Sequence, residues 1–178
     1  MAVLTEGRTA LPTGAWALDP VHSTIGFELP YLGGTFRGTF RDVAARLTEE
    51  SLTGSAKVAS VDAKDENLSA HLQSPEFFDV ERYPELSFES REIESADETL
   101  TVRGEITIRG ITKPVELTGT ISDVHADAYG NDRFNVNLST TVDRTEFGLN
   151  WNAPLPSGEP ALANEVKLVA ELYFVREA

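Results

Sequence analysis

The stretch LTVRGEITIR, residues 100–109, decides the fold class, because apolar and polar side chains alternate along it. One face carries Leu100, Val102, Ile106 and Ile108, and the other carries Thr101, Arg103, Glu105, Thr107 and Arg109. Successive side chains of a β-strand point to opposite faces of the sheet, so a period of two indicates a strand with one buried face. We therefore expect Arg103 and Arg109 to point outward and to pair with acids such as Glu105 or Glu116.

The same alternation recurs on both sides of this stretch, in residues 22–29, 115–121 and 134–142. The last run, residues 166–175, is apolar on both faces in places, which predicts a strand that is more covered than its neighbours. Turn-forming residues separate the runs, and residues 150–164 hold three prolines and a glycine. These signals predict about eight strands in mostly sequential hairpins, with one long loop before the last strand.

Strands with one apolar face must bury it, either by closing into a barrel or by stacking two sheets. Several runs are about ten residues long, which suits a barrel of about eight strands with room for one small ligand. We therefore expect an all-β fold, an eight-stranded antiparallel β-barrel, with a two-sheet sandwich as the alternative. We expect a flexible N-terminal segment, residues 1–13, and a single barrel domain, residues 14–178.

The composition argues against several classes of function. The 178 residues contain 15 Lys and Arg against 29 Asp and Glu, a net charge of −14, so nucleic acid is not an expected partner. The absence of cysteine excludes disulfides and thiolate metal sites. The histidines, His22, His71 and His125, lack metal-ligand spacing, and no cofactor-binding glycine motif occurs. We therefore expect neither a metal nor a cofactor.

The N-terminal residues do not resemble a secretory signal, because Glu6 and Arg8 interrupt the apolar positions. No window of the sequence reaches the apolar length of a membrane span. We therefore expect a cytoplasmic protein without permanent membrane insertion. Strand edges and the apolar last strand are compatible with a homodimer.

A short helical insert is expected at about residues 65–80, between strands. Its N-cap candidates are Asp62, Asp65 and Asn67. Leu68, His71 and Leu72 lie at helical spacing and would share one face. Ser74-Pro75-Glu76 is a second helix-start signal, with a Ser cap followed by Pro at the first helical position.

Phe77 and Phe78 follow this second start signal. We expect them to anchor the insert to the barrel. The alternative is that they plug one mouth of the barrel or line a cavity.

Several blocks, in order along nearly the whole chain, resemble the YceI-like family of polyisoprenoid-binding proteins. They are WALDPVHS (16–23) with IGF (25–27), FRGTF (36–40), HLQSPEFFDV (71–80) with YP (83–84), GEITIRGITKPV (104–115), DRTEFGL (143–149) and NEV (164–166). The resemblance implies an extended lipocalin-like barrel whose lumen holds a long isoprenoid chain, such as a polyprenyl phosphate or a quinone tail. It implies a binding protein that is not an enzyme.

The expected lumen residues are hydrophobic side chains on inward strand faces, together with one tyrosine. They are Ile25, Phe27, Leu29, Tyr31, Phe36, Phe40, Leu86, Phe88, Val102, Ile106, Val136 and Leu138. Tyr31 stands near the place where relatives carry a histidine, and it could donate one hydrogen bond. Pro30 lacks a backbone N–H, so this part of the strand should be an edge or a bulge. An ordinary filled core is the alternative to a hollow lumen.

The head-group candidates are Arg37, Arg144 and His22. A guanidinium binds phosphate through two parallel hydrogen bonds, which favours the two arginines. Two other functions stay open: a hydrolase or isomerase acting on a small apolar substrate, and a structural or interaction module with a filled core. The enzyme alternative needs a titrating group in the lumen, such as an inward His22 within reach of Asp19.

Overall fold

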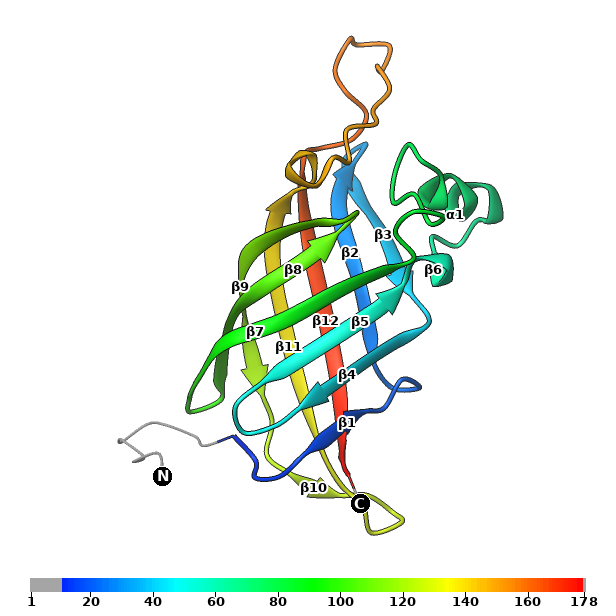
Figure 1. The fold of residues 1–178 in the computed structure, drawn as a ribbon. Helices are drawn as coiled ribbons and strands as arrows, with labels where there is room; N and C mark the ends of the chain where they lie inside the picture. The colour runs from blue at the N-terminus through cyan, green and yellow to red at the C-terminus, as the bar shows by residue number, and fades with distance from the viewer. Residues whose placement is uncertain (1–10, 178) are drawn as a thin grey trace.

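The computed structural model describes residues 11–177, and within them the chain forms a barrel with one short α-helix at its side (Figure 1). The strands are β1 (Trp16–Leu18), β2 (Thr24–Tyr31), β3 (Gly34–Phe40), β4 (Val43–Leu47), β5 (Leu52–Lys57), β6 (Val61–Asp62), β7 (Glu85–Ala96), β8 (Thr99–Ile108), β9 (Ile111–Ile121), β10 (His125–Ala126), β11 (Asp132–Asp143) and β12 (Glu165–Arg176). The helix is α1 (Glu66–Gln73), and two 3₁₀ turns are η1 (Val58–Ser60) and η2 (Arg144–Phe147).

Eight of the described strands close into an antiparallel ring, which confirms the predicted barrel and excludes the sandwich. The ring order is β11-β9-β8-β7-β5-β4-β1-β12, and pairing of β11 with β12 closes it. One edge of β12 is shared between β1, opposite 174–176, and β2, opposite 167–171. The predicted extra coverage of the last strand is not found against β11: four of the twelve β12 residues are exposed, compared with two of the twelve in β11.

The two ends of the barrel are built differently. At the lower end in Figure 1, near β1 and β10, the wall is completed by β1, which pairs with β12 and β4. At the upper end β2 and β3 extend the wall, and β3 pairs with β6 only at Thr39 and Phe40 among the described residues. Pro30 lies beyond the last β2 residue that pairs with β12, so its missing N–H costs no bond there, as expected of an edge position. Helix α1 contacts β6, which pairs with the end of β3.

The insert begins and ends at identifiable caps. Asp65, one of the three predicted N-caps, accepts a hydrogen bond from the Leu68 N–H at 2.8 Å. The helix ends at Ser74, whose hydroxyl donates to the His71 carbonyl at 2.6 Å. The predicted second helix start is therefore a helix end followed by turns, because the residue before a proline avoids the helical conformation.

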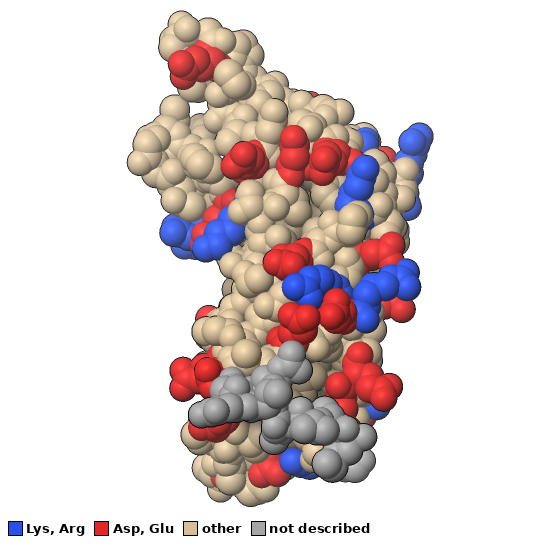
Figure 2. All heavy atoms as spheres, turned by 90° about the vertical axis from the view of Figure 1, so that its left-hand side faces the viewer, with Lys and Arg blue, Asp and Glu red and all other residues tan. Residues whose placement is uncertain are grey.

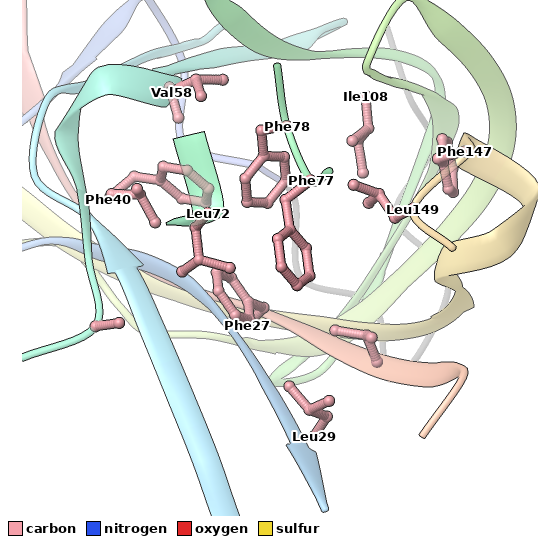
Figure 3. Close-up of a cluster of buried hydrophobic side chains, with 14 of the residues drawn as sticks. Phe27, Leu29, Phe40, Val58, Leu72, Phe77, Phe78, Ile108, Phe147 and Leu149 are labelled. Carbon is pink, nitrogen blue, oxygen red and sulfur yellow. The ribbon is translucent and has the colours of Figure 1, made fainter. Parts of the chain in front are cut away.

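Two hydrophobic clusters fill different levels of the barrel. The lower one centres on Trp16, whose ring meets Phe134 edge-on at 4.7 Å, while Phe134 stacks on Phe174 at 5.6 Å. The upper cluster centres on Phe27, Phe40 and Phe78 (Figure 3). The predicted flexible segment, residues 1–13, lies mostly outside the described residues; Leu11 packs against the lower cluster.

The outer face of β7, β8 and β9 carries acids and bases side by side (Figure 2). Arg103 pairs with Glu116 at 2.9 Å and with Glu94 at 3.2 Å, which agrees with its predicted outward orientation. Glu105 pairs with Arg91 instead, at the bulge in β7. These exposed pairs neutralise part of the surface charge and add little stability.

Arg109 departs from its expected outward position because it lies in the turn after β8, where the strand period no longer applies. Arg109 and Gly110 both have positive φ, as two-residue hairpin turns require. The Arg109 guanidinium donates to the Pro75 carbonyl at 3.1 Å and the Gly148 carbonyl at 3.2 Å. It thus joins the β8–β9 turn to the insert and to the end of η2.

None of the described helices has both the length and the apolar character that a membrane span requires.

The pairing of β9 with β11, one of the contacts of the ring, predicts a glycine requirement at position 119. A Cβ at Gly119 would lie 1.7 Å from the Asn137 carbonyl oxygen of the neighbouring strand. We expect Gly119→Ala to lower the free energy of unfolding by about 3 kcal/mol, seen as a lower urea midpoint. Gly34→Ala, where the nearest atom is 3.7 Å away, is the control and should keep the wild-type midpoint. Equal midpoints for the two variants would contradict this account of closure.

The bridging role of Arg109 predicts a local effect. Arg109→Met removes donors from two carbonyls, so we expect a loss of about 2 kcal/mol in unfolding free energy. Amide hydrogen exchange should accelerate in residues 74–79 and 144–149. Arg41→Met is the control, because Arg41 is exposed and its carboxylate partner Asp62 is 4.0 Å away. Unchanged exchange in residues 74–79 of Arg109→Met would show that Arg109 does not hold the insert.

Candidate functional site

An apolar cavity of about 440 Å³ lies at the upper end of the barrel, between its wall, the insert and the long loop of residues 150–164. Its wall is almost wholly hydrophobic. The strands and η2 contribute Phe27, Leu29, Tyr31, Phe36, Phe40, Leu86, Ile108, Val142, Phe147, Val166 and Leu168. The cavity exists because β2 and β3 widen the wall here, and a wider barrel is not filled by its own side chains.

The insert supplies one side of this cavity. Leu68, His71 and Leu72 all line it, which agrees with their predicted common helical face. Phe77 and Phe78 are both buried, as anchors should be, and both also line the cavity (Figure 3). The two interpretations of this pair are therefore compatible: the rings hold the insert in place by filling part of the wall.

An aromatic cluster connects the insert to the long loop. The His71 ring lies edge-to-face between Phe77 and Trp151, with both centroid distances at 4.9 Å. The Phe77 and Trp151 rings are 5.3 Å apart. The loop thus packs over the cavity through Trp151. Trp151 was not identified as a site residue from the sequence. A large aromatic side chain in a loop otherwise rich in proline was the feature that could have indicated it.

A second, smaller apolar cavity of about 130 Å³ lies lower in the barrel. It shares four wall residues with the upper cavity, so the two chambers adjoin, and these shared residues form the neck between them. The shared residues are Phe40, Leu86, Ile108 and Leu168.

Ten of the twelve expected lumen residues line one or both chambers. Phe27, Leu29, Tyr31, Phe36, Phe40 and Leu86 line the upper one, and Ile25, Phe40, Leu86, Phe88, Ile106 and Leu138 line the lower one. Val102 and Val136 line neither, because they lie within the lower cluster that fills the bottom of the barrel. Alternation assigns a side chain to the inner face but does not give its depth along the barrel.

Arg144 is the one permanently charged side chain among the described residues that line the upper cavity. Only 6% of its surface is exposed. Its Nε donates to the Ala163 carbonyl at 2.9 Å, and its Nη1 donates to the carbonyls of Leu149 at 2.6 Å and Trp151 at 2.9 Å. Within residues 11–177, Nη2 has no hydrogen-bond partner and no carboxylate forms a salt bridge with this guanidinium.

The hydrogen bonds that the Arg144 guanidinium makes to described residues therefore all go to neutral carbonyl oxygens. Burial lowers the pKa of Arg144, and the nearby Asp143 carboxylate acts in the opposite direction. Asp143 itself accepts from the N–H and hydroxyl of Thr145. Arginine remains protonated in proteins, so the wall of the cavity contains one positive charge, whose Nε and Nη1 are bonded to carbonyl oxygens.

The other two head-group candidates do not reach the cavity. Arg37 is exposed on the outer wall and pairs with Glu28 at 3.1 Å. His22 lies at the lower end, 65% exposed, with Nδ1 2.6 Å from the Asp19 carboxylate. Burial raises the pKa of Asp19, but hydrogen bonds from His22 and Arg133 outweigh it and lower the pKa overall. His22 is within reach of Asp19 but does not line the cavity, so it does not support the enzyme alternative.

No group of three or more His, Asp or Glu side chains in the described part of the chain could hold a metal ion. The chemistry of the site is thus that of an apolar pocket with one buried cation and, at its rim, the half-exposed Tyr31. Such a pocket suits an apolar molecule with one polar end.

Comparison with known proteins gives a consistent result. Residues 16–174 match the sequence profile described as the YceI-like domain. A UPF0312 protein of Pseudomonas putida (strain W619) is 34% identical over 157 residues, covering 83% of this chain and 82% of the relative.

Two solved structures share the fold. BcnA of Burkholderia cenocepacia superposes with a TM-score of 0.74 at 20% identity, over 88% of this chain and 98% of that one. A domain from Saccharophagus degradans, described as polyisoprenoid binding and implicated in plant cell wall breakdown, gives a TM-score of 0.67 at 10% identity, over 91% and 98%. The ordered sequence blocks, the barrel and the profile match agree, and the chain belongs to the YceI-like family.

Proposed function

We propose that this protein binds an amphiphilic isoprenoid lipid, such as a polyprenyl phosphate or an isoprenoid quinone, and acts as its carrier or store. The observation that carries the proposal is the apolar cavity with one buried, partly unsatisfied guanidinium in its wall. The description of the Saccharophagus degradans domain as polyisoprenoid binding supports the same ligand class.

The two parts of such a ligand match the two parts of the site. Transfer of the tail from water into the cavity is favourable by roughly 25 cal/mol for each Å² of apolar surface removed. The polar head would lie against Nη2 of Arg144, where it completes the hydrogen bonding of a buried charge. Tyr31, at the rim, is placed to donate a second hydrogen bond.

The proposal is one of binding without catalysis. The described titratable side chains in the cavity wall are Tyr31, His71 and Arg144. His71 is packed between two aromatic rings, and its Nε2 is 3.6 Å from the Glu76 carboxylate, outside hydrogen-bond range. A cytoplasmic location and a homodimer remain predictions from the sequence.

The two tryptophans provide a test of ligand position. Trp151 lines the cavity, whereas Trp16 is fully buried in the lower cluster. Titration with geranylgeranyl diphosphate should change tryptophan emission saturably in the wild type and in Trp16→Phe. The change should disappear in Trp151→Phe. Mass spectrometry of an organic extract of the purified protein gives an independent readout.

An unchanged response in Trp151→Phe would place the ligand elsewhere. A protein that yields no prenyl lipid on extraction and takes none up would overturn the proposed function.

The head-group role of Arg144 is tested by comparing a charged and a neutral ligand. A hydrogen bond to a charged group is worth about 1.5–3 kcal/mol, so Arg144→Gln should weaken geranylgeranyl diphosphate binding at least tenfold. Binding of geranylgeraniol, which lacks the charge, should change far less. Arg37→Gln is the control and should bind both ligands as the wild type does.

Arg144 also holds three carbonyls, so Arg144→Gln needs a check of its fold by near-ultraviolet circular dichroism. Arg144→Lys, which keeps the charge, should retain more affinity for the diphosphate than Arg144→Gln. If wild-type protein binds the alcohol and the diphosphate equally well at low and high salt, Arg144 does not bind an anionic head.

A further inference from the structure

We infer that this barrel accepts a short isoprenoid tail, of three to five isoprene units, and that its solid lower half sets the limit. The inference rests on the proposed function and concerns which member of the ligand class fits this chain. It follows from the volumes of the two chambers, the packing beneath them and the neck between them.

The chamber volumes bound the number of carbon atoms. An apolar protein cavity of about 150 Å³ holds one benzene molecule, so each carbon needs roughly 25 Å³. The upper chamber, about 440 Å³, then has room for roughly 18 carbons. The lower chamber, about 130 Å³, adds roughly 5, or one more isoprene unit. A tail of eight units would need roughly 1,000 Å³ by the same measure, far more than both chambers offer.

The floor of the lower chamber is closed by rigid packing. Leu172 lines this chamber, and the next inward residue of β12, Phe174, is fully buried between Phe134 and the rest of the lower cluster. Trp16 closes the cluster from β1, with its indole N–H bonded to the Thr13 carbonyl and the Arg176 guanidinium 4.3 Å above its ring. A tail therefore has no route out through the lower end.

Strand β12 gives the depth available to the tail. Val166 lines the upper chamber and Leu172 the lower one, a separation of about 20 Å along the strand. Arg144 lies at the upper end, at the start of η2, so a ligand with its head there directs its tail down this path. The tail passes the neck at Phe40, Leu86, Ile108 and Leu168 and ends against the lower cluster.

Phe88 limits how many isoprene units of the tail fit into the lower chamber. It lines the lower chamber but not the upper one, and its ring tip lies against Gly104, where an added Cβ would be 2.8 Å away. Replacing Phe88 by alanine removes a phenyl ring and frees roughly the volume of one benzene, enough for one more isoprene unit.

The experiment is a competition series of all-trans prenyl diphosphates of 15, 20, 25 and 40 carbons, read out by Trp151 emission. Wild-type affinity should rise at least tenfold from 15 to 20 carbons and then stop rising. The 40-carbon ligand should bind at least tenfold more weakly than the 20-carbon ligand. Phe88→Ala should move the optimum to 25 carbons, and Tyr129→Ala, an exposed aromatic that lines neither chamber, should leave it unchanged.

The outcomes separate this inference from the proposed function. Equal or tighter binding of the 40-carbon ligand overturns the length limit and leaves lipid binding intact. Failure of every ligand in the series overturns the proposed function itself. If Phe88→Ala loses its fold, the wild-type series alone decides the limit; if it folds and keeps the wild-type optimum, Phe88 does not set the length.

Discussion

The pairing of β12 with three partner strands is the constraint on which the rest of the structure depends. One edge of β12 pairs with β11 throughout, and the other edge is divided between β1 and β2. Because β1 also pairs with β4, the strands of the lower level form a closed ring of eight. A barrel of eight strands is narrow enough for side chains to fill. Because β2 pairs with β3, these two strands extend the wall at the upper level, and β3 has an edge that is only partly paired among the described residues. One strand thus fixes a solid half and a hollow half of the barrel, and the apolar cavity lies in the hollow half.

The insert and the long loop complete the hollow half with aromatic packing and main-chain bonds to two arginines. Phe77 and Phe78 fill the side left open by β3, and Trp151 brings the loop over the chamber through His71. Arg109 and Arg144 bind carbonyls of the insert, η2 and the loop. A buried arginine with only carbonyl partners costs desolvation that its hydrogen bonds offset in part. The two carbonyls bonded to Arg109 join structural segments, whereas Arg144 is itself a residue of the cavity wall.

The alternation of residues 100–109 predicted the strands, their inward faces and, with their number and length, the barrel. It could not distinguish Val102 from Ile106, which share a face of one strand, yet the first is packed in the floor and the second lines a chamber. A period of two carries no information on depth, which depends on contacts between strands distant in sequence. Arg37 and Arg144 offered the same local signal, and only the fold turned one to the outer wall and buried the other. Trp151 was missed because a loop has no periodicity to interpret.

The strongly acidic surface bears on how an anionic ligand would be recognised. With a net charge of −14, the protein repels anions at a distance, and screening by salt limits this repulsion to about 10 Å. Many described surface arginines are paired with carboxylates, as Arg103 is with Glu116, and acidic and basic side chains lie side by side on the face shown in Figure 2. Arg144 differs because it is buried among apolar side chains, where the dielectric constant is low and an interaction with a phosphate oxygen is strengthened. A free phosphate lacks the apolar tail whose burial would favour entry, whereas a prenyl phosphate gains both interactions at once. A cavity with this geometry would therefore bind the proposed amphiphile more tightly than either of its parts alone.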